Sequence, residues 1–258
     1  MRGIRFSARQ LFWFAWLEAR SCLFAALLFA GLAVTSVVPL PLARYDALLL
    51  YGIALTVVFW AVGLETGREV LVIAMFHVVG LVFELVKVRL GSWSYPDDAV
   101  TKLGGVPLYS GFLYAAVGSY ICQAWRLLGL RVSRYRALPT ALVAAAIYAN
   151  FLTHHWIADL RLPLAVLLLA VTWGTTVHFT VGAVRYRMPL ALSLTLVGFF
   201  LWLAENLATL LSAWQYPHQA DVWHLVHSAK FGAWALLVSV SFVLVAGLQA
   251  RVGRLREP

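Results

Sequence analysis

The sequence predicts an all-α, polytopic transmembrane bundle of about eight spans, built as two parallel four-helix repeats with both termini in the cytoplasm. The 258 residues are 62% hydrophobic and only 12% charged, whereas a soluble domain is nearer half apolar and a quarter charged. The apolar residues form continuous runs of about 20, long enough to cross a bilayer as helices. A short motif also occurs twice, 121 residues apart.

The predicted spans follow the apolar runs along the chain. They cover residues 20–39, 46–64, 69–90, 106–128, 139–157, 162–182, 188–210 and 229–249. Pro107, Pro139, Pro163 and Pro189 fall in the first turn of four spans, where a missing N–H does no harm. We therefore expect one membrane domain over residues 1–258, with residues 1–130 and 131–258 as its two half-repeats.

Arginines are concentrated in alternate connections between the spans. These connections hold Arg2, Arg5, Arg9, Arg68, Arg126, Arg131, Arg134, Arg136, Arg185, Arg187, Arg251, Arg254 and Arg256, and the intervening ones hold Asp46, Asp97, Asp98, Asp159 and Asp221. By the positive-inside rule, both termini are cytoplasmic in a multi-pass protein of the inner, or cytoplasmic, membrane. The rule also accounts for the net charge of +9 without a nucleic-acid partner.

The repeated motif is Glu-x8-Trp-x-Tyr-Pro. Its copies comprise Glu84, Trp93, Tyr95 and Pro96, then Glu205, Trp214, Tyr216 and Pro217. Four spans separate the copies, so both run in the same direction and both acids lie at outer ends of spans. His77 and Lys87 correspond to Gly198 and Ala208 in the second copy, which makes Glu84 the better candidate for the active group.

Other polar residues gather at the same predicted outer end. A charged group within a span costs several kcal/mol and is by default a sign of function. Besides the two glutamates, the outer ends hold Lys87, Asn150, His154, His155, Asp159, Asn206, His224, His227 and Lys230. Seven residues separate His77 from Glu84, so the two share a helix face. Asp159 follows His155 by four residues, a spacing at which a carboxylate can orient an imidazole.

These residues predict an acid/base site for an apolar, lipid-like substrate. Glu84 and Glu205 are the predicted acid and base, with His154, His155 and Asp159 as a proton relay and His227 and Lys230 holding an anionic group. The predicted substrate-binding residues are His77, Lys87, Trp93, Tyr95, Asn150, Asn206, Trp214 and Tyr216. The plainer alternatives are a belt of interfacial aromatics and a structural ion pair between Glu84 and Lys87.

Two other functions stay open. A transporter or lipid-binding protein without chemistry would also carry repeats and intramembrane charges. A metal-dependent enzyme is the other, with a divalent metal held among His154, His155, His224 and His227. No other cofactor is predicted, and the expected partners are membrane lipids and the apolar substrate.

Several segments carry a family resemblance. The residues from Phe83 to Pro96, Gly105 to Phe112, Tyr148 to His155 and Ala213 to Pro217 resemble the YoaT-type family of bacterial integral membrane proteins, a family without an assigned function. Glu84, the Gly-x-Trp-x-Tyr-Pro segment that begins at Gly91, and Gly105-x-Pro107 are also similar in layout to membrane carotenoid cyclases and hydratases. That second resemblance implies protonation of an isoprenoid, although Leu108, Tyr109 and Ser110 stand where the cyclases carry an acidic pair.

Overall fold

A computed structural model of the chain describes residues 2–251, and its side chains are described from residue 7 to residue 250. Arg254 and Arg256, counted above as cytoplasmic charges, lie outside the described residues, and the side chains of Arg2, Arg5 and Arg251 are not described.

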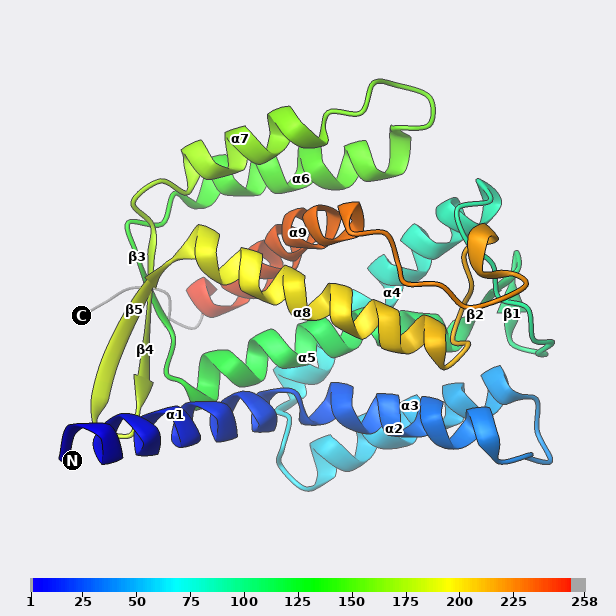
Figure 1. The fold of residues 1–258 in the computed structure, drawn as a ribbon, viewed down its shortest axis with the longest axis horizontal. Coiled ribbons are helices and arrows are strands. Elements are labelled where there is room, and N and C mark those ends of the chain that lie inside the picture. The colour runs from blue at the N-terminus through cyan, green and yellow to red at the C-terminus, as the bar shows by residue number, and fades with distance from the viewer. Residues whose placement is uncertain (1, 252–258) are drawn as a thin grey trace. The chain divides into compact units, whose positions relative to one another are not determined.

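The described chain is mainly helical (Figure 1). The helices are α1 (Arg2–Ser21), α2 (Leu23–Val37), α3 (Arg44–Ala61), α4 (Gly67–Arg89), α5 (Gly111–Leu127), α6 (Ala137–Thr153), α7 (Arg161–Val171), α8 (Leu190–Leu210) and α9 (Ala229–Arg251). Short strands are β1 (Lys102–Leu103), β2 (Val106–Pro107), β3 (Arg131–Ser133), β4 (Thr176–Val181) and β5 (Val184–Pro189), and the 3-10 turns are η1 (Leu108–Ser110) and η2 (Pro217–Gln219).

Within the described residues, four helices are long and apolar enough to cross a membrane: α3, α4, α8 and α9. The number rises to five if α1 and α2, which meet at Cys22, count as one broken span. Each of the eight predicted spans contains a helix, but α5 and α6 have 17 residues each, α2 has 15 and α7 only 11. Helices this short fall below the length of about 20 residues that spans the hydrocarbon core.

The sixth predicted span, over residues 162–182, is wrong in its second half. Helix α7 ends at Val171, and the chain continues as the hairpin β4–β5, turning at Gly182 with φ +61°. Alternating polar and apolar residues from Thr176 to Val181 give the two-residue period of a strand. His178 therefore lies on β4 rather than on a helix, and Pro189 ends β5 just before α8. Residues 2–21, placed ahead of the first span, form helix α1.

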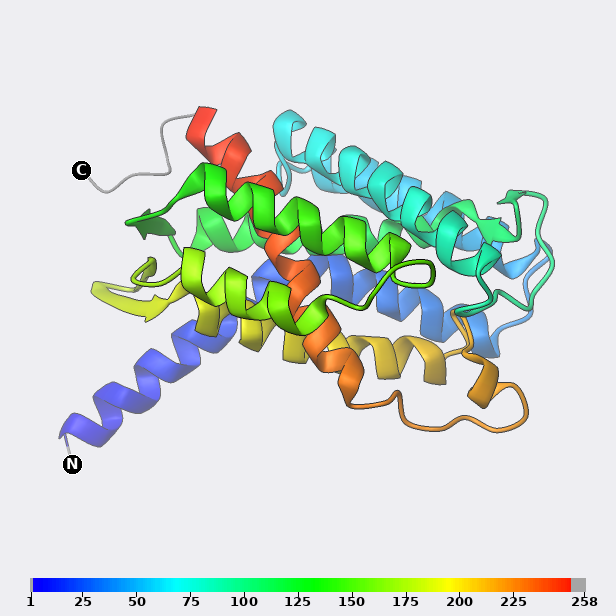
Figure 2. The same cartoon turned by 90° about the horizontal axis from the view of Figure 1, so that it is seen from above.

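Two compact units make up the fold, and each draws on both sequence halves. Unit 1 comprises residues 1–22, 121–201 and 228–258. Within its described part, α6 packs against α7 and α9, with α6 and α7 side by side in Figures 1 and 2. The antiparallel sheet β3-β4-β5 packs on α1, where the rings of Phe14 and Phe179 lie 5.7 Å apart.

Unit 2 comprises residues 23–120 and 202–227. Its helices α2 and α3 pack together, and the Tyr51 hydroxyl donates to the Leu27 carbonyl across 2.7 Å. Helices α4 and α5 approach closely because Gly80 leaves room for a ring: a Cβ there would lie 2.5 Å from Tyr114. This close approach positions Tyr114 for the site described next.

Candidate functional site: two buried glutamates joined by a repeated loop

The first glutamate stands near the end of α4. The helix begins with a capping box, in which Thr66 accepts from the Glu69 N–H and Glu69 accepts from the Thr66 N–H. It ends in a Schellman motif: Gly91 adopts φ +68°, and the N–H groups of Gly91 and Ser92 donate to the carbonyls of Val88 and Lys87. The reversal turns the following residues back toward Glu84.

Three donors enclose Glu84, whose side chain is only 4% exposed. The Trp93 indole and the Tyr95 hydroxyl donate to its Oε2 across 2.6 and 2.9 Å, and the Tyr114 hydroxyl donates to Oε1 across 2.7 Å. Because Trp93 and Tyr95 are themselves buried, they act as ligands of the acid rather than as interfacial aromatics. Tyr114 is not among the site residues predicted from the sequence, since it lies on α5, outside the repeated motif.

The second glutamate lies in the same arrangement of helix end and tyrosine donor. Helix α8 ends in the same motif, with Ser212 at φ +53° in the place of Gly91. The N–H groups of Ser212 and Ala213 donate to Thr209 and Ala208, each bond shifted by 121 residues from its counterpart. Tyr216 donates its hydroxyl to Oε1 of Glu205, as Tyr95 does to Glu84. Glu205 is 5% exposed.

The two copies of the motif pair with each other. Ser94 and Gln215, which stand at equivalent positions, form an isolated antiparallel bridge with both N–H···O distances at 3.0 Å. Alongside it, the rings of Trp93 and Tyr216 meet edge to face with centroids 6.0 Å apart. The Trp93 indole, which donates to Glu84, therefore contacts the Tyr216 ring, whose hydroxyl donates to Glu205.

The phenols of this network are held in their protonated form. Burial raises the pKa of Tyr95 well above its usual range, and the Glu84 charge acts in the same direction. Burial likewise raises the pKa of Tyr216. The charge of Glu205 raises it further, and so does that of Glu84 from the other copy of the motif. Both hydroxyls therefore remain donors to the carboxylates, and Tyr216 lies within the electrostatic reach of both acids.

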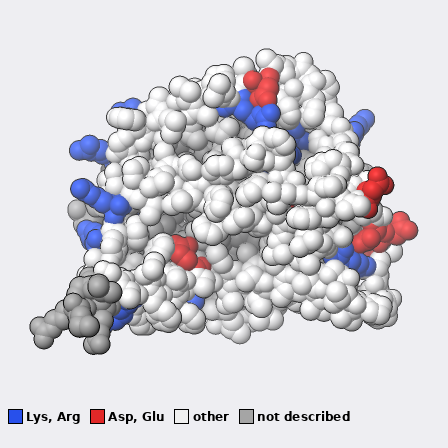
Figure 3. Space-filling view, viewed as in Figure 1, with Lys and Arg blue, Asp and Glu red and all other residues white. Residues whose placement is uncertain are grey.

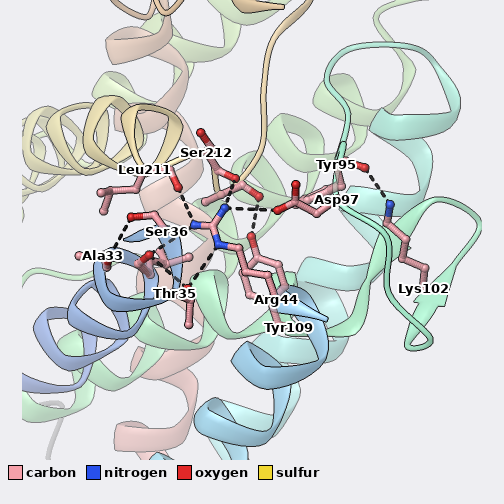
Figure 4. A network of polar contacts seen from close by, with 12 residues as sticks. Ala33, Thr35, Ser36, Arg44, Tyr95, Asp97, Lys102, Tyr109, Leu211 and Ser212 are labelled. Atoms are coloured by element: carbon pink, nitrogen blue, oxygen red, sulfur yellow. Dashed lines mark hydrogen bonds and ion pairs between the residues drawn. The ribbon is translucent and has the colours of Figure 1, made fainter. Parts of the chain in front are cut away.

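Arg44 and Tyr109 hold the second copy of the motif in place (Figure 4). Arg44, at the start of α3, donates to the carbonyls of Leu211 and Ser212 across 2.6 and 2.9 Å and pairs with Asp97 at 3.4 Å. The Tyr109 hydroxyl donates to the Ala213 carbonyl across 2.6 Å. Three consecutive carbonyls at the end of α8 are thereby satisfied. Neither Arg44 nor Tyr109 is among the site residues predicted from the sequence.

Other predicted residues of unit 2 surround the glutamates. Lys87 is 3% exposed, with its ammonium 5.7 Å from the Phe83 ring centroid. His77 packs edge-on to Phe112, and its Nδ1 is buried without a hydrogen-bond partner. Asn206 accepts from the Val226 N–H across 2.8 Å, which ties the loop after η2 to α8.

Of the remaining predicted residues of unit 2, Trp214 lies beside Tyr216, whereas His224 and His227 are exposed in the loop before α9. They do not begin a helix, since α9 starts at Ala229.

The remaining predicted residues belong to unit 1, so the predicted site is divided between the units. Asn150 is buried and fixes the turn after α6, donating to Ala158 and accepting from Leu160. The rings of His154 and His155 lie 4.2 Å apart. Lys230 is half-buried in the first turn of α9.

Asp159 binds an arginine that the sequence analysis had left out of the site. Both of its oxygens accept from Nε of Arg161 at 2.9 Å. The arginine, mainly through these hydrogen bonds, lowers the pKa of Asp159 to about 2, with a smaller contribution from His154. Arg161 is therefore the main partner of this carboxylate.

Metal ligands do not cluster in the described part of the chain: no group of three or more His, Cys, Asp or Glu is placed to hold an ion. His154 and His155 belong to unit 1, and His224 and His227 to unit 2. A bound divalent metal stays a prediction. Elemental analysis of the purified protein would check it, and less than about one metal ion per chain would count against a metal enzyme.

Fold and site together define a helical protein with several helices apolar enough to cross a membrane and two buried glutamates in an aromatic network. Residues 10–242 match the family model described as "Protein of unknown function (DUF817)", and the chain belongs to this family. It is 51% identical over 251 residues to the "Uncharacterized protein YoaT" of Bacillus subtilis (strain 168), covering 96% of this chain and 94% of that protein. No solved structure matches the chain significantly.

Proposed function

We propose that this protein is a multi-pass membrane enzyme that adds and removes a proton on an apolar, lipid-like substrate, with Glu84 and Glu205 as its acid and base. The observation that carries the proposal is the Ser94–Gln215 bridge, which joins the two glutamate networks through Trp93 and Tyr216. Burying two carboxylates is costly, and paired buried acids of this kind are typical of proton-transfer sites.

The chemistry needs no change of redox state. One glutamic acid donates a proton to the substrate, and the other glutamate removes a proton from a different atom, as in an isomerisation or in the loss of a proton after protonation. In Glu84, both lone pairs of Oε2 are engaged by Trp93 and Tyr95, so Oε1 is the oxygen with room for a proton. The roles of His154 and His155 as a proton relay and of Lys230 in holding an anionic group stay predictions, because these residues belong to unit 1.

The proposal includes a finer topology. The shared helix-end hydrogen bonds, each shifted by 121 residues, and the near-symmetric bridge support an internal duplication of four helices. On this basis we propose eight membrane segments in two parallel halves, in the bacterial inner membrane, with both termini in the cytoplasm and the site toward the outer face.

Complementation of a deletion strain tests the enzyme. Glu84→Gln and Glu205→Gln should each leave the strain's lipid and isoprenoid profile unrestored, whereas wild type restores it. Glu69→Gln is the matched control, because Gln can keep the capping box at the other end of α4. Membrane abundance and thermal stability of each variant separate lost chemistry from lost folding. Full restoration by both site variants, at normal abundance, would rule out acid/base catalysis by this pair.

A proton-coupled transporter is the second candidate, and one observation favours it. Glu65, 1% exposed ahead of α4, accepts from the Ser119 hydroxyl of α5 across 2.5 Å. Acids therefore stand at both ends of the α4–α5 pair, with His77 between them, as in proton paths. In liposomes containing the purified protein, proton flux that Glu65→Gln abolishes, without product formation from added lipid, would favour transport over catalysis.

A further inference from the structure

Unit 1 contains a charged surface that the proposed function does not use. Unit 1 as a whole holds 15 of the 20 Lys and Arg residues of the chain but only three of the 11 Asp and Glu residues. Several of these cations belong to the sheet β3-β4-β5. Figure 3 shows Lys and Arg side chains along the edge of the view where Figure 1 labels these strands.

The strand register places a histidine between two arginines. His178 on β4 pairs with Arg131 on β3 and with Arg187 on β5. Residues directly opposite in a sheet point to the same face, with Cβ atoms about 5 Å apart. Arg185 lies two residues from Arg187, so it shares the face, and both arginines are exposed.

The two faces of this sheet have opposite character. The face toward α1 is apolar and includes Phe179, which contacts Phe14. The other face carries the paired residues Arg131, Ser133, Thr176, His178, Thr180, Arg185, Arg187 and Pro189. The positive-inside rule explains why arginines occur in this connection. It does not explain why Arg131, Arg185 and Arg187 share one face of the sheet.

We propose that this basic face binds the phosphate of an anionic phospholipid headgroup. Arginine forks match phosphate oxygens in geometry, and a bound phosphate would offset the repulsion between Arg185 and Arg187, which lie two residues apart on this face. The hairpin leads directly into α8, one of the helices apolar enough to cross a membrane, so it lies at the level of a membrane surface. Trp173, 80% exposed in the turn before β4, is placed as an interfacial anchor beside it.

Lipid retention by the purified full-length protein tests this site. Native mass spectrometry would compare phosphatidylglycerol with phosphatidylcholine on wild type and on the double variant Arg185→Gln, Arg187→Gln. We expect wild type to prefer phosphatidylglycerol and the double variant to bind it about tenfold more weakly, the effect of losing about one charge-assisted hydrogen bond. The matched control is Arg68→Gln with Arg89→Gln, which removes two exposed arginines of unit 2 and should bind as wild type does.

Two further arms make the result decisive. Arg185→Lys with Arg187→Lys keeps the charge but loses the forks, so intermediate retention is expected even if the glutamine variant misfolds. In thermal-shift measurements on wild type, phosphatidylglycerol should stabilise the protein and inorganic phosphate over the same concentrations should not. Equal loss in the unit 2 control, or equal stabilisation by inorganic phosphate, would overturn the lipid site.

Discussion

The two glutamates lie at equivalent helix ends but have different neighbouring side chains. Glu84 has Lys87 and His77 on its own helix, whereas the equivalent positions near Glu205 are Ala208 and Gly198. Tyr114 adds a donor to Glu84 from α5. These differences sit on α4 and α5, so they arise from the side chains of the first half and not from the shared motif.

Tyr114→Phe should weaken the folded state by about 1–3 kcal/mol, because Oε1 of buried Glu84 is left without its hydrogen-bond donor. The ring itself, which packs over Gly80, is kept. Thermal unfolding in detergent would measure the change. Tyr186→Phe on β5 is the control, since that ring stacks on Phe179 and is half-exposed. An equal effect of the two substitutions would contradict a special role for Tyr114.

At the scale of the element, the ends of α4 and α8 differ in one residue that matters for strain. Gly91 and Ser212 both adopt positive φ, but only glycine does so without cost. Ser212→Gly should therefore raise stability by up to about 1 kcal/mol, and Gly91→Ala should lower it by about 1–2 kcal/mol. Denaturant unfolding would measure both. Gly247→Ala, in the open interior of α9, controls for the added methyl group; a loss of stability there as large as at Gly91 would contradict the φ argument.

Arg44 joins three elements through one guanidinium. Arg44→Lys should lower stability by about 2–3 kcal/mol, since a single ammonium cannot reach the carbonyls of Leu211 and Ser212 together with Asp97. The same variant should impair complementation, because the second motif is held by these bonds. Melting temperature and lipid profile would be measured together, with exposed Arg68→Lys as the control. An unchanged melting temperature of the Arg44→Lys variant would show that these guanidinium contacts are not needed for stability.

The hairpin β4–β5 shows why one element was mispredicted. Residues 162–182 read as a continuous apolar run, yet β-branched and aromatic residues alternate with polar ones from Thr176 onward. A window of 20 residues averages over this two-residue period. The pairing with β3, which is distant in sequence, then stabilises the strand, and this contact cannot be read from local pattern.

For the whole molecule, the predicted topology makes a direct prediction. In a variant lacking Cys22 and Cys122, single cysteines at Asp98 and Asp221 should react with a membrane-impermeant thiol reagent in intact cells. Cysteines at Arg68 and Arg134 should react only after permeabilisation, because basic connections are cytoplasmic. Labelling of lysed cells controls for accessibility of each site. Reaction of Asp98 and Asp221 on opposite sides would contradict two parallel halves.

Local periodicity and spacing are enough to predict the membrane-like composition, the helical class, the position of most helices and the repeated glutamate motif. Tertiary structure decided the rest. It showed that Ser94 pairs with Gln215, that Tyr114 completes the ligands of Glu84, and that Arg44 caps α8. These contacts join residues 30 to 168 positions apart, as in Tyr114–Glu84 and Arg44–Ser212. Hydrogen bonds at such separations follow from packing, and no local pattern encodes them.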